Sequence, residues 1–539
     1  MSRKPCEGCL PLQESTNVDQ PYLDTVIYDN FCEMIKGRFE SCPDRDAIRY
    51  MSGNDTVNIT YREMTEQIAA VYGFFRSKNM KNRHIAILSE NRYEYIIIYL
   101  AAVLDNVIIP LDRELDSETV GRCLEKFDAD MLFCTERTAE KAAGFSGDTV
   151  NIDRDFGVIL NEKLPIEEFF LSAQHTDKDR FAVLASTSGT DGEMKGVMLS
   201  QYNVIVNVRG TLENNVLKDP TIAFLPMNHT YGFNPCMLAT LYNGTTLCLC
   251  LSVKHLLRDL KAFDPYFFGA VPMVIEGMYD GIQREIRKRG KEKTVTRLIK
   301  LSRFFLKFHI DLRHIFFGSF INRRLRLVVN GGAALRAELV EKFGDIGITI
   351  LNGYGLTECA PTIAVSRVCN NVAGSAGTIM KHIDVRIAED GEILVKGPNV
   401  MLGYYKNEEA TKAAFRDGYF ATGDTGYTDG KVIYVTGRKK NLIILGNGKN
   451  VPPEMLEDRL GSIPCVKECL VVPKKAAGRN TILCAKIVLR ENSDGSSLRE
   501  DIAAVNRELP DYMRIDDYEI MDSEFEKNSS RKIKRNLYV

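Results

Sequence analysis

The sequence predicts an α/β fold built around a largely parallel sheet. Short β-rich runs such as His84–Leu88 and Phe181–Ala185 alternate with helical apolar periodicity from Tyr28 onward. Strands separated by helices are typical of parallel sheets, whose ligands bind at the carboxyl ends of the strands. A chain of 539 residues is longer than one domain. We therefore expect a large N-terminal domain of mixed and parallel sheets over residues 1–437, and a small, mobile α+β domain over residues 438–539.

Residues 1–21 form a polar leader that we expect to be poorly ordered. This leader lacks the apolar core of a signal peptide, and the most apolar run, Tyr95–Pro110, is interrupted by Asp105 and Asn106. A formal net charge of -2 excludes the broad basic field of a nucleic-acid-binding protein. The 14 irregularly spaced cysteines indicate reduced thiols. These features predict a cytoplasmic protein.

The segment Leu184–Ser200 predicts an anion site. A predicted strand runs there into hydroxyl, glycine and lysine residues, namely Thr187, Ser188, Gly189, Thr190, Gly192 and Lys195. Such a loop offers backbone N–H groups, hydroxyl donors and one compact cation to a group with several oxygens, and a triphosphate fits best. The loop is not a Walker A motif, because Lys195 is followed by Gly196. On these residues alone, an ordinary Ser/Thr/Gly turn is the alternative.

A basic region follows between Arg284 and Arg324, where thirteen Lys and Arg stand against three Asp and Glu. Apolar residues recur there at spacings of three and four, which predicts one basic amphipathic helix around residues 297–315. Its apolar stripe consists of Leu298, Leu301, Phe305, Phe308, Leu312 and Ile315. Such a stripe usually packs on its own domain. The alternative is contact with an anionic membrane, which would place the protein peripherally at an inner membrane face.

Several polar clusters follow predicted strands farther along the chain. His229 lies in the first, although a lone histidine is more often structural than catalytic. Small residues at Gly331–Ala333 would admit a flat ring close to the backbone. Asn352–Glu358 offers an aromatic face, a hydroxyl and a carboxylate, and Asp424 offers a carboxylate suited to a ribose diol. By charge alone, the basic tail at residues 531–535 would be a solvated end.

Taken together, these clusters resemble those of the adenylate-forming superfamily, which contains acyl-CoA synthetases, peptide-synthetase adenylation domains and firefly-type luciferases. The resemblance covers about Thr60 to Arg535. It rests on STSGTDGEMKG, LPMNHTYG, NGYGLTE, GEILVKG, YFATGD and GRKKNLIILGNGKNVPPE in the family's order and spacing. The GKNVPPE run and a long insert between Pro272 and Leu325 look like the long-chain fatty acyl-CoA synthetase branch.

The resemblance implies a nucleotide site. The loop from Thr187 to Gly196 would bind the β- and γ-phosphates of ATP. Adenine would lie between Gly331, Gly332 and Ala333 on one side and Asn352, Gly353 and Tyr354 on the other, with Gly355 in the same site. Thr357 would contact the α-phosphate, Glu358 and Thr190 would bind Mg²⁺, and Asp424 and Arg438 would bind the ribose.

The resemblance also implies the groups that carry the reaction. His229 would lie beside the carboxylate substrate, and Lys532 would bridge that carboxylate and the α-phosphate. Lys440 would be the hinge of the small domain, and Gly446 and Gly448 would line the path of the incoming thiol.

The implied reaction has two steps in one pocket. A carboxylic acid, a fatty acid by the branch resemblance, would be joined to AMP with release of pyrophosphate. Mg²⁺ and Lys532 would reduce the repulsion between the two anions. A swing of the small domain about Lys440 would then admit the thiol of CoA. One rival uses the phosphopantetheine of an acyl carrier protein in place of CoA, and another is a degenerate nucleotide-binding homologue without turnover.

Three positions depart from the family's pattern. Asp191 replaces a threonine and puts a carboxylate beside the phosphates. Met194 replaces a proline, which leaves the loop less rigid. Arg531 replaces the glycine before the catalytic lysine, so Lys534 is the second candidate for the role of Lys532.

Overall fold

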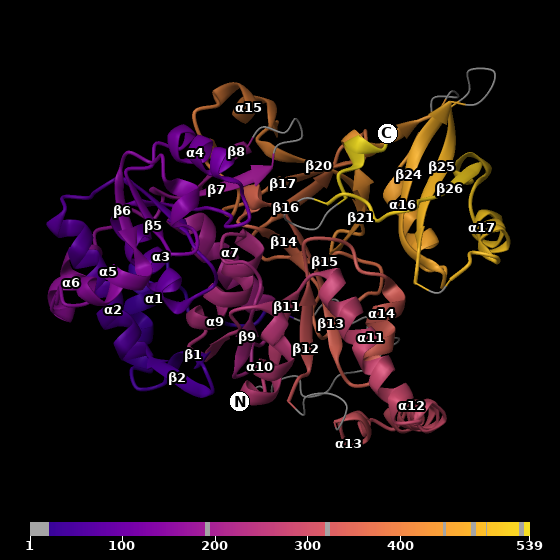
Figure 1. Ribbon diagram of the computed structural model, residues 1–539, viewed down its shortest axis with the longest axis horizontal. Coiled ribbons are helices and arrows are strands. Elements are labelled where there is room, and N and C mark those ends of the chain that lie inside the picture. Colours follow the sequence, from indigo (N-terminus) through magenta and orange to yellow (C-terminus); the bar gives the residue numbers. More distant parts are fainter. Residues whose placement is uncertain are drawn as a thin grey trace. The chain divides into compact units, whose positions relative to one another are not determined.

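The computed structural model describes residues 21–188, 194–318, 324–445, 449–475, 481–491, 493–527 and 533–539 (Figure 1). The chain forms two compact units. Unit 1 is Met1–Asp384 with Val395–Phe420, and unit 2 is Val385–Leu394 with Ala421–Val539. Helices and strands alternate through unit 1, so the predicted α/β fold is confirmed. Unit 2 begins earlier in the chain than residue 438, where we expect the mobile domain to start; that expectation stays a prediction.

The first sheet of unit 1 carries the predicted phosphate loop, and its order is β18-β8-β7-β4-β3-β5-β6. The strands are β3 (His84–Leu88), β4 (Val107–Pro110), β5 (Met131–Cys134), β6 (Asp148–Asn151), β7 (Phe181–Ser188), β8 (Met194–Ser200) and β18 (Gly403–Tyr404). The neighbours β7, β4, β3, β5 and β6 are parallel. β4 and β5 are buried at every position, as expected for parallel strands covered on both faces.

The second sheet includes, in unit 1, the order β15-β14-β13-β12-β11-β9-β10-β1-β2. Its strands are β1 (Asp46–Ser52), β2 (Asp55–Thr60), β9 (Thr221–Ala223), β10 (Leu247–Leu249), β11 (Phe267–Ala270), β12 (Leu327–Asn330), β13 (Thr349–Gly355), β14 (Thr362–Val365) and β15 (Gly377–Ile379). β9, β11, β12 and β13 are parallel, so their carboxyl ends lie at one edge. The predicted segments around His229, Gly331 and Asn352 all follow or end these strands.

Helices pack around these sheets in unit 1 (Figure 1). They are α1 (Phe31–Ser41), α2 (Tyr61–Ser77), α3 (Tyr93–Asp105), α4 (Ser117–Lys126), α5 (Ile152–Ile159), α6 (Ile166–Ala173), α7 (Gln201–Asn214), α8 (Thr230–Phe233), α9 (Ala239–Tyr242), α10 (Leu256–Phe263), α11 (Pro272–Lys288), α12 (Glu292–Leu306), α13 (Arg313–Phe317), α14 (Ala337–Asp345) and α15 (Glu408–Ala413). The most apolar segment of the sequence forms α3, which is buried from Tyr95 to Leu104. Among the described residues, no helix has the length and apolarity needed to cross a membrane.

The basic region does not form the single helix predicted around residues 297–315. α12 ends at Leu306, and the chain then turns through His309, whose φ of 60° is left-handed, before α13 begins. The predicted stripe is divided as well, because Leu298 packs on the core of unit 1 whereas Leu301 is exposed. Apolar spacing predicts a helix, but it does not reveal a turn that interrupts one.

Unit 2 has the α+β organisation predicted for the small domain. It contains β21 (Val432–Arg438) with most of β16 (Asp384–Ile387), β17 (Glu392–Lys396) and β20 (Tyr419–Thr428), and also β22 (Ile443–Ile444), β23 (Asn450–Val451), β24 (Val466–Lys475), β25 (Thr481–Leu489), β26 (Asp517–Ile520), α16 (Pro453–Gly461) and α17 (Leu498–Arg507). β24, β25 and β26 form one sheet. Leu456 of α16 and Leu498 of α17 are buried in the same core as Val471 of β24.

Candidate active site

The hairpin of β7 and β8 forms the base of the predicted phosphate loop. Thr187 in β7 lies opposite Lys195 in β8. Strand β18 pairs with the other side of β8 and places Tyr404 opposite Val197. The hairpin is continuous with α7, because Ser200 caps the N-terminus of that helix. Strand pairing therefore holds the bases of both arms of the loop.

Tyr404 connects this hairpin to the predicted metal-binding glutamate. The Lys195 ammonium lies 5.1 Å from the centre of the Tyr404 ring, within cation–π range. The Tyr404 hydroxyl donates to Glu358 Oε1 at 2.9 Å. Burial, and then the Glu358 carboxylate, raises the pKa of this hydroxyl, whose ordinary value already lies above neutral pH, so the hydroxyl is a donor. Lys195 and Tyr404 also line a cavity of about 150 Å³, together with Lys126.

Buried asparagines hold the backbone that carries Glu358. Asn207 donates its side-chain N–H groups to the carbonyl oxygens of Cys359 at 3.0 Å and Thr362 at 2.7 Å. Asn399 donates to the same two oxygens, at 2.9 and 3.1 Å. Both asparagines are buried, so these bonds replace water as the partners of the loop carbonyls. The short helix Thr357–Cys359 is thereby fixed at the end of β13.

The two segments predicted to enclose adenine begin side by side. Asn330, the last residue of β12, lies opposite Asn352 in β13. Asn330 Nδ2 donates to Asn352 Oδ1 at 3.3 Å and to the carbonyl oxygen of Ala333 at 3.0 Å. The segments 331–333 and Asn352–Gly355 therefore start from paired positions of β12 and β13, and the binding of adenine between them stays a prediction.

Two glycines in these segments are required by close neighbours. A Cβ atom on Gly331 would lie 2.4 Å from the ring of Tyr231, and a Cβ atom on Gly355 would lie 1.8 Å from the carbonyl oxygen of Pro361. The hydroxyl of Tyr231 donates to the carbonyl oxygen of Val329 at 2.9 Å. Tyr231 therefore connects the segment that contains His229 to the end of β12.

His229 lies at the N-terminus of α8, after β9. Asn91, which follows β3 in the other sheet, holds the segment before it. Asn91 Nδ2 donates to the carbonyl oxygen of Leu225 at 2.8 Å, and the N–H of Met227 donates to Asn91 Oδ1 at 3.1 Å. One side chain thus satisfies two backbone groups and positions the turn that leads to His229.

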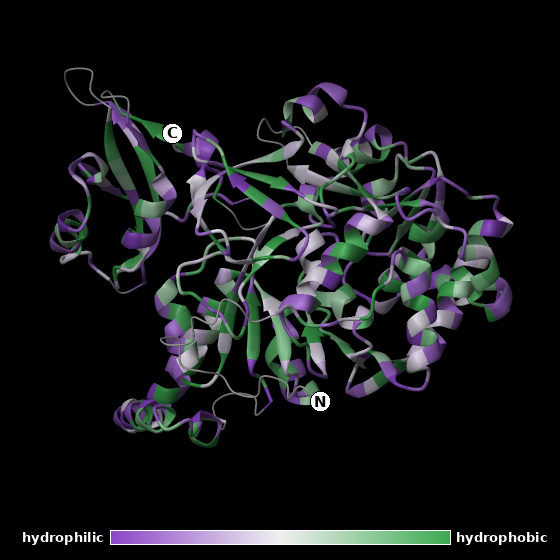
Figure 2. Cartoon of the chain, turned by 180° about the vertical axis from the view of Figure 1, so that it is seen from behind, coloured by the Kyte–Doolittle hydropathy of each residue, from purple (hydrophilic) through white to green (hydrophobic). Residues whose placement is uncertain are grey.

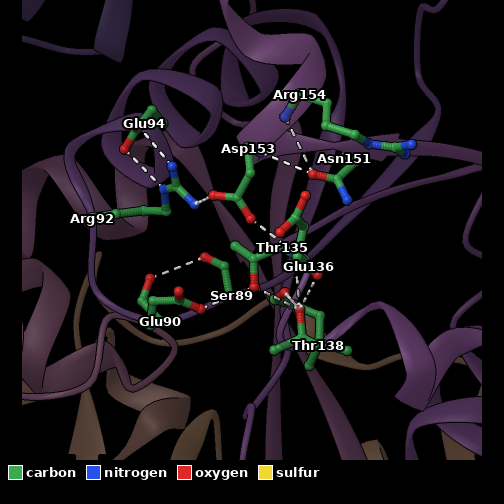
Figure 3. A network of polar contacts seen from close by, with 11 residues as sticks. Ser89, Glu90, Arg92, Glu94, Thr135, Glu136, Thr138, Asn151, Asp153 and Arg154 are labelled. Atoms are coloured by element: carbon green, nitrogen blue, oxygen red, sulfur yellow. Dashed lines mark hydrogen bonds and ion pairs between the residues drawn. The ribbon is translucent and has the colours of Figure 1, made fainter.

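The loop that carries Asn91 is fixed by a network of charged groups (Figure 3). Arg92 donates to both carboxylate oxygens of Glu94 at 2.9 Å and to Asp153 at 2.6 Å. Thr135, after β5, donates to Glu90 at 3.0 Å. The Arg92 side chain is only 17% exposed, so water and salt screen these pairs less than surface pairs. The network makes the loop a rigid support for Asn91.

The resemblance places His229 beside the carboxylate substrate. With His229 in that role, replacement of Asn91 by alanine is expected to slow acyl-adenylate formation about tenfold, because a small displacement of His229 would disturb the reacting geometry. The Michaelis constant for the acid should rise while that for ATP stays unchanged, and pyrophosphate release measures both. Asn243→Ala is the matched control, since Asn243 binds the carbonyl oxygen of Leu217 at the exposed surface. Equal Michaelis constants in Asn91→Ala and in the wild type would contradict a positioning role.

The predicted ribose-binding pair is formed within unit 2. Asp424 in β20 lies opposite Arg438 in β21, and Arg438 Nε is 2.9 Å from Asp424 Oδ1. Asp424 is 6% exposed, so its carboxylate is held within the unit. Lys439, the next residue, lies 2.9 Å from Glu392 Oε2. Lys440 follows in the short helix Lys439–Asn441, and its role as a hinge stays a prediction.

The C-terminal segment around the predicted catalytic lysine is anchored on both sides. Lys527 and Ile533 form an antiparallel bridge. Arg535 binds both carboxylate oxygens of Glu457 at 2.7 Å and also donates to the carbonyl oxygen of Val471 at 2.9 Å. Lys534 Nζ lies 3.6 Å from Glu526 Oε2. These contacts fix the chain immediately before and after residues 528–532.

Replacement of Arg535 by alanine is expected to destabilise unit 2 by about 3 to 5 kcal/mol, because it leaves the Glu457 carboxylate buried without its cation. The two side chains are 19% and 16% exposed. Hydrogen exchange of the α16 and β24 amides measures the loss. Lys534→Ala, which removes an exposed pair, should cost less than about 1 kcal/mol. Similar exchange in both variants would show that the Glu457 pair is not a main support.

Six predicted site residues lie outside the described residues. They are Gly189, Thr190, Gly192, Gly446, Gly448 and Lys532. The departures at Asp191 and Arg531 also lie outside them, and so does the side chain of Ser188. The roles of all these residues stay predictions.

The sequence analysis missed the residues that position the site. Tyr404, Asn91, Asn207 and Asn399 are each far in sequence from the group they hold. Tyr404 lies shortly after the GEILVKG motif, and this is the one sequence signal that could have directed attention to it. The asparagines carry no spacing pattern, because their partners are single backbone groups.

Comparison with known proteins agrees with this geometry. The family model described as AMP-binding enzyme matches residues 36–405, and that of the AMP-binding enzyme C-terminal domain matches residues 455–532. The chain therefore belongs to the AMP-binding enzyme family.

Two relatives and one solved structure specify the likeness further. The chain is 28% identical to the long-chain-fatty-acid–CoA ligase FadD15 of Mycobacterium bovis, over 83% of this chain and 80% of the relative. It is 26% identical to the 2-succinylbenzoate–CoA ligase of Listeria monocytogenes, over 88% of this chain and 93% of the relative. Its structure matches the o-succinylbenzoate CoA synthetase of Bacillus subtilis, solved with the acyl-adenylate intermediate OSB-AMP, with a TM-score of 0.75 at 23% identity over 94% and 97% of the two chains. The predicted adenylate-forming fold is confirmed.

Proposed function

We propose that this protein is an acid–thiol ligase that activates a carboxylic acid with ATP and transfers the acyl group to CoA. The observation that carries the proposal is the arrangement of Lys195, Tyr404 and Glu358. The Lys195 ammonium and the Glu358 carboxylate come from distant motifs, and both contact Tyr404 at the base of the predicted phosphate loop. Membership of the AMP-binding enzyme family supports a nucleotide as the ligand, and the two named relatives are CoA ligases.

The residues present fit a magnesium ion. Mg²⁺ prefers carboxylate and phosphate oxygens, and Glu358 offers a carboxylate whose backbone is fixed and whose Oε1 is oriented by Tyr404. We assign Glu358 and Thr190 as the protein ligands. When bound, the ion would neutralise charge on the phosphates of ATP.

In the first step, an oxygen of the substrate carboxylate would attack the α-phosphorus of ATP. The bond from that phosphorus to the bridging oxygen would break, and pyrophosphate would leave. We assign Thr357 to the α-phosphate, Lys195 to the outer phosphates, and Lys532 to the space between the two anions. Asp424 and Arg438 are assigned to the ribose.

In the second step, the sulfur of the deprotonated thiol would attack the carbonyl carbon of the acyl-adenylate. The bond to the phosphate oxygen would break, AMP would leave, and a thioester would form. We propose that rotation about Lys440 separates the two steps, removes Lys532 and brings Gly446 and Gly448 to the thiol path. The site would have to exclude water in the interval, because the mixed anhydride hydrolyses easily.

We propose a fatty acid as the substrate and the cytoplasm as the location. The likeness to FadD15 and the long insert between Pro272 and Leu325 support the fatty acid, whereas the likeness to the 2-succinylbenzoate ligase favours an aromatic dicarboxylic acid. Pyrophosphate release with CoA should be measured for a series from acetate to stearate and for 2-succinylbenzoate. A rate maximum at long chains supports the proposal, and a maximum at 2-succinylbenzoate contradicts it. No turnover with any acid would favour a degenerate nucleotide-binding homologue.

The acceptor needs a separate experiment, because CoA and a holo acyl carrier protein share the same pantetheine thiol. With the best acid of the series, thioester yield should be compared for free CoA and for a holo carrier protein. We expect free CoA to be the better acceptor. A clear preference for the carrier protein would replace CoA in the proposal and leave the adenylation step intact.

A further inference from the structure

We propose that α12 and the turn after it form a docking surface for an anionic phospholipid bilayer. The surface, called here the α12 surface, consists of Leu301, Phe304, Phe308, Ile310 and Ile315 with the flanking cations Lys293, Arg297, Lys300 and Lys307. It lies in the basic region of unit 1, and none of its residues is assigned to the reaction.

The opposite face of α12 is anchored to unit 1. Val295, Ser302 and Leu306 are buried, and Leu298 packs against the core. Arg303 in addition holds both carboxylate oxygens of Asp345 in α14, at 2.6 and 2.7 Å. The usual interpretation of an amphipathic helix, packing on its own domain, is thus already satisfied by this face. The remaining apolar side chains need another explanation.

Those side chains are exposed. The exposed fractions are 44% for Leu301, 54% for Phe304, 62% for Phe308, 47% for Ile310 and 76% for Ile315. The rings of Phe304 and Phe308 are 5.3 Å apart, so the two residues form one apolar projection. Exposed apolar side chains that project in this way indicate an interaction site. Figure 2 shows apolar and polar residues alternating on α12, at the lower left of the view.

The charge around the patch selects an anionic partner. Lys293, Arg297, Lys300 and Lys307 are all exposed. At 100° per residue, the first three lie on the same side of α12 as Leu301 and Phe304. A basic helix with exposed aromatic and leucine side chains is the composition that binds at the boundary of headgroups and acyl chains. A second copy of the chain fits less well, because a symmetric contact would oppose these cations to themselves.

A membrane at this surface would supply the apolar acid of the proposed function, so the biological role of the α12 surface rests on that function. Its test does not, because vesicle binding is measured without turnover. The full chain is sedimented with vesicles of phosphatidylglycerol and phosphatidylcholine in equal parts, and with vesicles of phosphatidylcholine alone. We expect the partition coefficient to be more than about tenfold larger for the anionic vesicles and to fall with added salt.

Two variants test the two components of the surface. Phe304→Ser with Phe308→Ser should lower partition into anionic vesicles more than about tenfold, and Lys300→Gln with Lys307→Gln should do the same while reducing the salt dependence. The matched control is Val158→Ser with Leu171→Ser, since these residues are 68% and 64% exposed on α5 and α6. Its binding should equal that of the wild type.

The proposal is overturned if the wild type does not bind anionic vesicles, or if the phenylalanine variant binds as well as the control. It is also overturned if light scattering shows that the wild type is a dimer and the phenylalanine variant is a monomer, because the α12 surface would then be a contact between copies. Capture of an acidic protein without vesicle binding would likewise replace the bilayer as the partner.

Discussion

Replacement of Lys532 by alanine is expected to slow acyl-adenylate formation by on the order of a hundredfold or more. The lysine is assigned to the space between the substrate carboxylate and the α-phosphate, where its charge reduces repulsion in the first step only. Thioester formation from supplied acyl-adenylate and CoA should therefore stay near the wild-type rate. Pyrophosphate release measures the first step, and thioester yield from acyl-adenylate measures the second.

Lys534→Ala is the control for this experiment. Because Arg531 replaces the family's glycine, Lys534 is the second candidate for the position of the catalytic lysine. Lys534 is 3.6 Å from Glu526, and the neighbouring Arg535 is held by Glu457, so we expect Lys534 to remain at the surface of unit 2. Its replacement should change either rate less than about twofold, as for an exposed ion pair. If Lys534→Ala shows the selective loss instead, the catalytic role belongs to Lys534. Equal loss of both steps in Lys532→Ala would refute the assignment.

Replacement of Glu358 by glutamine is expected to lower the rate of adenylation on the order of a hundredfold, because the charge assigned to Mg²⁺ binding is removed while the shape is kept. Glutamine can still accept the hydrogen bond from Tyr404, so the local fold should persist. The Mg²⁺ concentration needed for half the maximal rate should rise. A titration of pyrophosphate release against Mg²⁺ measures both effects.

Tyr404→Phe separates the charge of Glu358 from its orientation. The phenyl ring keeps the cation–π contact with Lys195, but Glu358 loses its hydroxyl donor. We expect a smaller loss, about tenfold, with a modest rise in the Mg²⁺ requirement. The metal assignment fails if Glu358→Gln leaves the Mg²⁺ requirement unchanged, or if its thermal unfolding shows that the loss is one of stability.

Several strands beside the candidate site were predictable from short segments of the sequence. β3 has the predicted bounds, and β7 contains the predicted strand Phe181–Ala185. Residues 331–333 and Asn352–Gly355 follow or end neighbouring strands, because parallel strands bring their carboxyl ends to one edge, whereas their contact with adenine stays a prediction. The polar residues of such loops can be recognised locally, since glycine, hydroxyl and carboxylate groups cluster within a few positions.

The supporting residues were not predictable in this way. Asn91 binds the backbone near Leu225, 134 positions away, and Tyr404 binds Glu358, 46 positions away. No periodicity connects such pairs, because each depends on the path of two sheets through space. The prediction of one helix around residues 297–315 was wrong for a related reason. The turn at His309 ends the helix, but the apolar spacing continues through it.

The α/β fold class and the family of the chain were determined by the sequence alone, because each is encoded within short segments. The tertiary structure alone decided which side chains hold those groups in place. It also decided which side of α12 faces the core and which side exposes Phe304 and Phe308. An apolar side chain is buried only where the rest of the fold provides a surface for it, and that surface is built from segments far away in the chain.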